Sequence, residues 1–187
     1  VIKGKAAHAG LAPEKGISAI QAAARAVNNM KLLRIDEETT ANIGRINGGG
    51  ATNIVCDKVE MEMEARSLTR SKVEAQAKHM LECIDDACRE FGAGHETTQQ
   101  LNYTELNIPK DAEVIKLVDS AIKRIGLETR LESTGGGSDT NIMSGKGIQA
   151  VTLGIGMTNA HTTSECIAIS DMEKTAELVA SIIQEAR

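Results

Sequence analysis

Residues 55–66 read VCDKVEMEMEAR, and from Lys58 onward charged and apolar side chains alternate. A period of two places successive side chains on opposite faces of a strand. The pattern therefore predicts an antiparallel strand with one covered face and one wet face. The covered face would carry Val55, Val59, Met61, Met63 and Ala65, and the wet face would carry Lys58, Glu60, Glu62, Glu64 and Arg66.

Helical spacing appears on both sides of this strand. Residues 17–34 repeat apolar positions at Ile17, Ile20, Ala24, Val27, Met30 and Leu33, which predicts a helix. Ser71 and Glu74 are spaced as a capping box. The helix that they would open has an apolar stripe made of Val73, Ala77, Met80, Leu81, Ile84, Cys88 and Phe91.

Three further segments complete the first part of the chain. Residues 1–9 are extended and rich in small residues, residues 40–46 form a short strand, and residues 95–106 form another. The order strand–helix–strand–strand–helix–strand over residues 1–107 is the βαββαβ pattern of an α+β, ferredoxin-like domain.

The pattern changes after Asn107-Ile108-Pro109. Residues 108–187 alternate helices with apolar strands, predicted at 128–133 and 149–156, and end in a helix opened by Ser170 and Glu173. This alternation is typical of a parallel α/β layer, but two strands are too few to close one. We therefore expect residues 108–187 to be half of a domain. The opening VIKGKA lacks methionine and reads as the inside of a strand, so we expect the chain to be an excerpt of a longer protein.

The composition excludes several classes of function. A net charge of −5 and only two aromatic residues, Phe91 and Tyr103, argue against binding to nucleic acid. No apolar run is long enough to span a bilayer, and no signal-peptide pattern is present. The four cysteines show no C-x-x-C spacing, so we interpret them as reduced packing thiols of a cytoplasmic protein.

Residues 135–141, GGGSDTN, could be mistaken for a nucleotide loop. Thr140 stands where a dinucleotide fingerprint needs its third glycine, and no Walker lysine follows, so the phosphate interpretation is weak. A strand-to-helix turn with Asp139 as N-cap accounts for part of the pattern. Three successive glycines also leave bare backbone, whose N–H groups can receive a carboxylate or an oxyanion.

Four single residues are candidates for chemistry, and each has an ordinary alternative. His161 follows a predicted buried strand, where α/β sheets place their sites, and Glu165 could orient it, but histidine also caps and packs. His8 could be an ordinary loop histidine, Asn53 a turn residue, and Arg66 a solvated arginine.

Five motifs taken together resemble one family. In this order and spacing, they are similar to the lid domain and C-terminal part of the M20 metallopeptidases, and most similar to the peptidase T-like branch. The motifs are GKAAHAGLAPEKG (4–16), GGATNIV (49–55), EARS (64–67), GGGSDTN (135–141) and HTTSE (161–165). The resemblance covers essentially the whole chain. It implies a hydrolase of peptide or N-acyl amide bonds with two zinc ions in its active site.

The resemblance also implies roles for individual residues. His161 matches a zinc ligand, and His8 matches the lid histidine that stabilises an oxyanion. Asn53 and Arg66 match residues that hold the substrate, and Gly136 with Gly137 matches the loop that holds its terminal carboxylate. The family's remaining metal ligands are absent from this sequence, so we expect the isolated chain to be inactive.

The resemblance implies a homodimer formed through residues 1–107, in which His8 serves the partner's site, with a short peptide as substrate. Two alternatives stay open. The parent protein could be an M20 amidohydrolase of N-acyl or N-succinyl amino acids, or the chain could act only as a dimerisation module.

Overall fold

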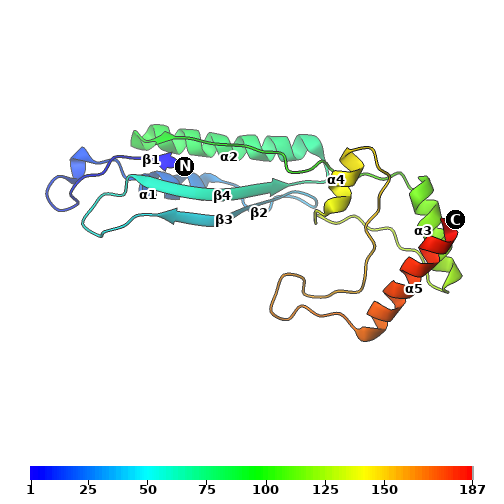
Figure 1. Cartoon of the computed structure of the whole chain (residues 1–187). Coiled ribbons are helices and arrows are strands. Elements are labelled where there is room, and N and C mark those ends of the chain that lie inside the picture. The colour runs from blue at the N-terminus through cyan, green and yellow to red at the C-terminus, as the bar shows by residue number, and fades with distance from the viewer. Residues whose placement is uncertain (187) are drawn as a thin grey trace. The chain divides into compact units, whose positions relative to one another are not determined.

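The computed structural model describes residues 1–186 as two compact units, the first from Val1 to Glu105 and the second from Leu106 onward. The first unit contains a five-stranded sheet and two long helices (Figure 1). Its elements are β1 (Ile2–Lys3), the short 3-10 helix η1 (Pro13–Lys15), α1 (Ala19–Asn29), β2 (Leu33–Arg34), β3 (Thr40–Gly48), β4 (Lys58–Arg66), α2 (Arg70–Phe91) and β5 (Gly94–His95). The second unit contains α3 (Glu113–Arg124), α4 (Asp139–Gly145) and α5 (Ile169–Glu185).

The sheet has the strand order β2-β3-β4-β1-β5, and every neighbouring pair is antiparallel. β4 pairs with β3 along its length, from Arg66 opposite Thr40 to Val59 opposite Gly48. Along β4 the apolar residues are buried or half-buried, whereas Lys58 and the three glutamates are exposed. The strand predicted from the alternating pattern is confirmed from Lys58 to Arg66, with one covered and one wet face. The prediction was wrong for residues 55–57, which precede the strand, and for Arg66, which is half-buried.

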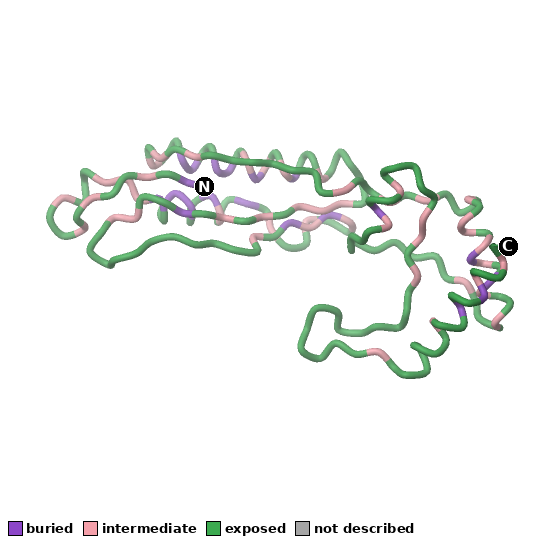
Figure 2. Tube along the Cα trace, in the orientation of Figure 1, coloured by how far each residue is buried: buried purple, intermediate pink, exposed green. Residues whose placement is uncertain are grey.

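Both helices of the first unit cover the same face of the sheet. One continuous cluster joins Ile2 of β1, Ala41 of β3 and Val59 of β4 to buried residues of α1 and α2. Figure 2 shows the buried residues of this unit concentrated where the helices and strands face one another. The cluster has no fully buried aromatic residue, so it depends on close approach of the backbones instead of on large side chains.

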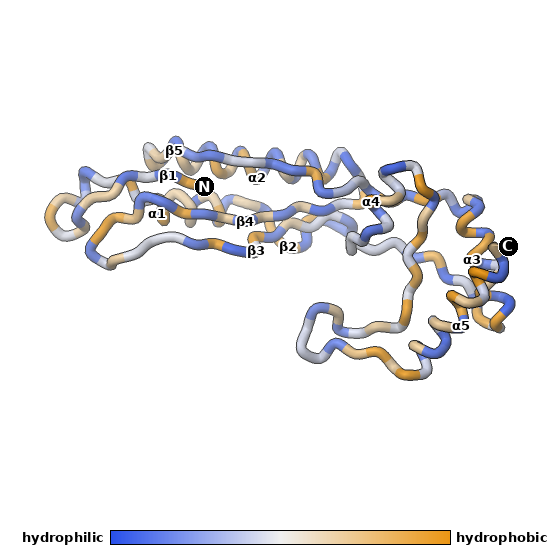
Figure 3. Tube along the Cα trace, viewed as in Figure 1, coloured by the Kyte–Doolittle hydropathy of each residue, from blue (hydrophilic) through white to orange (hydrophobic). Residues whose placement is uncertain are grey.

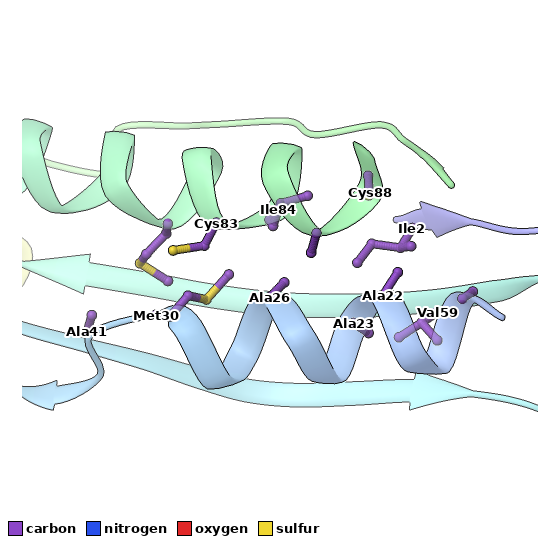
Figure 4. Packing of buried hydrophobic residues seen from close by; sticks show 13 residues of the cluster. Ile2, Ala22, Ala23, Ala26, Met30, Ala41, Val59, Cys83, Ile84 and Cys88 are labelled. Carbon is purple, nitrogen blue, oxygen red and sulfur yellow. The ribbon is translucent and has the colours of Figure 1, made fainter. Parts of the chain in front are cut away.

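The buried face of α1 differs from the predicted one. Ala22, Ala23 and Ala26 are almost completely buried, whereas Ile20 is 48% exposed and Ala24 is exposed. In Figure 4, Ala22 and Ala26 face α2. The prediction is confirmed for Met30, which is buried, and was wrong for Ile20 and Ala24. It missed the buried alanines because hydrophobic spacing favours large side chains, whereas the contact between α1 and α2 requires small ones.

Both predicted capping boxes were also wrong. α2 begins two residues earlier than predicted, with Thr69 as its N-cap, and Glu74 pairs with Arg70 instead of capping. α5 begins after Ala168, and neither helix has a side-chain hydrogen bond at its N-cap. The helices exist as predicted because their apolar faces are packed, and packing contributes more to helix stability than a cap does.

The strand predicted after α2 is shorter than expected. β5 runs antiparallel to β1, so His95 lies opposite Ile2, and the N–H of Glu96 donates to the carbonyl oxygen of Val1 at 2.9 Å. The rest of residues 95–106 forms no further strand in the part of the chain that is described.

Gly4 sits where the first strand passes the start of α1. A Cβ atom at this position would lie 2.1 Å from the carbonyl oxygen of Ile17 and 2.9 Å from the backbone nitrogen of Ala19. Lys5 and Ile17 exchange backbone hydrogen bonds of 2.9 Å next to this contact. Only glycine fits here, because the neighbouring atoms are backbone atoms that cannot rotate away.

The second unit has a small core. Val118 and Ala121 of α3 pack with Leu178 of α5, and the Ser181 hydroxyl donates to the carbonyl oxygen of Ala121 at 3.1 Å. The other side of α5 also carries apolar residues, but these are exposed (Figure 3): Ile169, Met172, Val179 and Ile183.

The strands predicted at 128–133 and 149–156 are not formed among residues 1–186. A strand needs a neighbour for its backbone N–H and C=O groups, and the second unit supplies none beside these segments. Within the same described range, no helix has the length and apolar character needed to cross a membrane.

The contact between α1 and α2 can be tested with one pair of substitutions. Ala26→Leu should lower the free energy of unfolding of this chain by about 1–3 kcal/mol, because the added side chain has no space between the helices. Ala24→Leu is the matched control on the exposed side of the same helix and should change stability by less than about 0.5 kcal/mol. Urea unfolding followed by circular dichroism measures both. Equal changes in the free energy of unfolding for the two variants would show that the contact between α1 and α2 does not limit side-chain size at Ala26.

Candidate functional site

His8 and Asn53 lie side by side at one end of the sheet. His8 forms an antiparallel bridge with Ile54, the residue that follows Asn53. The N–H of Ala9 donates to the carbonyl oxygen of Asn53 at 2.8 Å, and the N–H of Val55 donates to the carbonyl oxygen of Ala7 at 2.9 Å. Backbone pairing therefore brings together two candidate residues that are 45 positions apart in the sequence.

The ring of His8 has a defined hydrogen-bonding direction. Its Nδ1 atom accepts the backbone N–H groups of Gly10 at 3.1 Å and Leu11 at 3.2 Å. An Nδ1 atom that accepts hydrogen bonds carries no proton, so the neutral ring has its proton on Nε2. His8 is exposed, and its Nε2–H group can donate to a ligand.

A hollow lies next to Asn53. It has a volume of about 360 Å³ and is bordered by the glycine-rich turn 48–50, by Ile54 and Cys56, and by the charged residues Asp57, Lys58 and Glu60. Gly49 has a φ of +86°, a conformation that favours glycine. The first residues of the GGATNIV motif (49–55) therefore shape a surface depression, which is also bordered by Ile54, the residue that follows Asn53.

Arg66 lies at the opposite end of β4. Its Nε and Nη2 atoms donate to the two carboxylate oxygens of Glu64 at 3.0 and 2.8 Å. This pairing raises the pKa of the Arg66 guanidinium above its ordinary value, with a smaller contribution from Tyr103. The eight residue steps from Lys58 to Arg66 span about 26 Å at roughly 3.3 Å per residue. Within one copy of this unit, Arg66 therefore lies at the end of β4 that is farther from His8 and Asn53.

Gly136 and Gly137 lie in an exposed loop before α4. A Cβ atom at Gly136 would meet only the Thr134 hydroxyl, at 3.6 Å, so the space above this backbone is open. The sequence predicted Asp139 as the N-cap of α4, and this was wrong. The N-cap is Ser138, whose hydroxyl accepts the N–H of Thr140 and completes a capping box.

His161 is at the tip of a loop that its own hydrogen bonds hold together. Thr158 and Cys166 exchange backbone hydrogen bonds of 2.9 and 3.2 Å at the base of the loop. His161 has a φ of +65°, and its N–H donates to Glu165 Oε2 at 2.7 Å. The sequence predicted that Glu165 orients the ring of His161. In the structure Glu165 instead orients the backbone of His161. The imidazole is exposed.

The described residues contain no group of three or more histidine, cysteine, aspartate or glutamate side chains that could hold a metal ion. Zinc sites need three or four protein ligands, and His161 is a single candidate. The residues present therefore do not form a zinc site by themselves.

Residues 1–92 match the Peptidase dimerisation domain of the M20 type. This match covers α1, α2 and the strands β1 to β4, including His8, Asn53 and Arg66, and ends before β5. The chain belongs to the M20 peptidase family.

Solved M20 structures resemble the chain beyond this domain. Aminopeptidase PepT from Bacillus cereus ATCC 10987 is 46% identical, with a TM-score of 0.83 over 98% of this chain and 49% of that one. A tripeptidase from Staphylococcus aureus subsp. aureus Mu50 is 39% identical, with a TM-score of 0.87 over 100% of this chain and 50% of that one.

Curated relatives extend the comparison. YqjE of Bacillus subtilis (strain 168) is 45% identical over 99% of this chain and 50% of its own length. Succinyl-diaminopimelate desuccinylase of Psychrobacter sp. (strain PRwf-1) is 32% identical over 79% of this chain and 37% of its own length. The M20 chain thus spans about half the length, or less, of these relatives.

Two features escaped the sequence analysis. The pair of Glu64 with Arg66 could have been found, because residues two apart on a strand share a face. The role of His79 had no local signal: its Nε2 accepts the N–H of Lys31 at 3.1 Å, while Gln76 of the same helix donates to the Lys31 carbonyl oxygen at 2.8 Å. These two side chains hold the turn after α1.

The isolated M20 chain should bind zinc poorly, because one ligand does not compensate for the dehydration of the ion. Calorimetry with micromolar zinc should therefore detect no His161-dependent binding, so the wild-type chain and His161→Ala should give the same result. A tight site that depends on His161, or hydrolysis of a tripeptide by the purified chain, would show that further ligands exist among its residues.

Proposed function

We propose that the protein containing this chain is an M20 hydrolase that cleaves short peptides, as a zinc-dependent dipeptidase, tripeptidase or aminopeptidase. The similarity to a tripeptidase and to aminopeptidase PepT supports this function. The observation that carries it is the orientation of His8, because a fixed Nε2–H donor suits the oxyanion that forms when an amide carbonyl is attacked. The experiment is an assay of the complete protein on tripeptides, with and without chelator.

We infer further that residues 1–107 are a ferredoxin-like lid and that residues 108–187 are part of an α/β catalytic domain. The strand order β3-β4-β1-β5 supports the first inference, since a βαββαβ domain with both helices on one face has this order. The cytoplasm is the location we propose, consistent with four free cysteines.

The candidate residues divide into distinct tasks in this proposal. His8 donates to the carbonyl oxygen, Asn53 holds the peptide beside it, and Arg66 pairs with the terminal carboxylate. The bare backbone at Gly136 and Gly137 assists that carboxylate, and His161 is one ligand of two zinc ions. Zinc, when bound, would supply the Lewis acid of the site.

The length of β4 supports a homodimer in which His8 acts on the partner's substrate. A fully extended tripeptide spans about 11 Å at no more than 3.6 Å per residue. The backbone of β4 spans about 26 Å from Lys58 to Arg66, and His8 pairs with Ile54 beyond the Lys58 end, so the backbones of His8 and Arg66 are separated by more than the length of a tripeptide. This separation favours an arrangement in which the two residues come from two copies.

The second candidate is an amidohydrolase of N-acyl or N-succinyl amino acids, which the similarity to a desuccinylase favours. Both substrate classes present a carboxylate to Arg66 and an amide to His8. Assays of the complete protein on trialanine and on N-succinyl amino acids discriminate the two. A protein inactive on both, but dimeric, would fit the third alternative, a dimerisation module.

In the complete enzyme, Arg66→Ala should reduce kcat/KM on a tripeptide far more than on its C-terminal amide. Loss of a charge-assisted contact costs about 1.5–3 kcal/mol, or roughly 10- to 150-fold. The comparison of trialanine with trialaninamide measures this difference. Equal losses on the two substrates would remove Arg66 from carboxylate recognition.

Subunit exchange tests the dimeric site. His8→Ala and His161→Ala enzymes, each nearly inactive alone, should recover activity when mixed, because each mixed dimer contains one site with both histidines. At statistical exchange half of the dimers are mixed, so the ceiling is about a quarter of wild-type activity. Mixed dimers confirmed by native mass spectrometry that stay inactive would show that His8 does not serve the partner's site.

A further inference from the structure

Glu64 holds Arg66 in the geometry of carboxylate recognition. The guanidinium donates through two nitrogens to both oxygens of one carboxylate, at 3.0 and 2.8 Å. The neighbouring ion pair on the same face, Arg45 with Glu62, is a single contact of 3.1 Å. Arg66 is therefore engaged by its own chain through the paired donors that a peptide carboxylate would use.

The pair of Glu64 and Arg66 is local and does not connect distant elements. The two residues are two positions apart on β4, and they face the same side of the strand. Across the sheet, Glu64 lies opposite the uncharged Asn42. The side chains are 53% and 39% exposed, so water and a ligand both have access to them. The fold therefore does not require the Glu64 carboxylate.

We propose that Glu64 is an internal competitor for Arg66 and sets the affinity of the site for the carboxylate of its substrate. This inference rests on the proposed function, in which Arg66 binds that carboxylate. A substrate must displace Glu64 before it pairs with Arg66, so each binding event exchanges one bidentate pair for another. Substrates without a carboxylate gain nothing from the exchange, so Glu64 affects only the acids.

Glu64→Gln in the complete enzyme tests this proposal. The amide keeps the size of the side chain but removes the paired acceptor, so KM for trialanine should fall about two- to five-fold, the range expected from an exposed ion pair. KM for trialaninamide and kcat for both substrates should not change. Glu62→Gln is the matched control: it removes the same charge from the same face of β4, and it should leave both KM values unchanged.

The possible outcomes separate the proposal from its alternatives. A higher KM for trialanine, or a lower kcat on both substrates, would show that Glu64 positions Arg66 and does not compete with substrate. An unchanged KM for trialanine in Glu64→Gln would also overturn the proposal. So would an equal fall of this KM in Glu62→Gln, because the loss of one negative charge from this face of β4 would then explain both results.

A measurement without turnover distinguishes failure of this inference from failure of the proposed function. The Nε–H resonance of Arg66 can be followed by NMR while trialanine or its amide is added to the complete protein in the presence of chelator, so that the peptide is not consumed. If the wild type cleaves no peptide, the proposed function fails. The competitor role still stands if the trialanine concentration at half-maximal shift is lower in Glu64→Gln than in the wild type, and it falls if the two are equal or no shift occurs.

Discussion

The close contact between α1 and α2 is the constraint on which the first unit depends. With no aromatic side chain fully buried, the helices can cover the sheet only if their backbones approach each other, and the alanines of α1 permit that approach. The two side chains of α2 that hold the peptide group of Lys31 then determine where the chain leaves α1. From that point the chain enters β2 and β3, and β3 in turn pairs with β4, which carries Arg66.

Periodicity in the sequence predicted which helices and strands form in this unit better than it predicted which of their faces are buried. The period of two along β4 survives in the structure because one face of the strand meets the helices and the other meets water. The same method misjudged α1, where Ile20 is exposed and alanine is buried, because hydrophobicity alone does not report the space between two helices. In the second unit it predicted strands whose hydrogen-bond partners are absent from the described residues.

In the candidate site, the sequence likewise predicted individual residues better than their arrangement in space. Motifs identified His8, Asn53, Arg66 and His161 one at a time, and local hydrogen bonds now account for the orientation of the His8 ring and the His161 backbone. The separation of Asn53 from Arg66 follows from the predicted strand 55–66, but the place of His8 beside Asn53 depends on backbone pairing between residues 8 and 54, which the motifs do not report. Glu64 could have been identified as the partner of Arg66, because the two residues share one face of the predicted strand.

Gly4 differs from Gly135 and Gly136 in the reason for its glycine. Gly4 is a requirement of folding, since any side chain there would collide with the backbone that leads into α1. Gly135 and Gly136 meet no such obstacle, since the atoms nearest to an added Cβ are 3.6 Å away or farther. The first glycine therefore has its cause inside the unit that contains it. At Gly135 and Gly136, an alanine substitution can leave folding unchanged and still impair function. Only the effect on function reports what contacts this bare backbone.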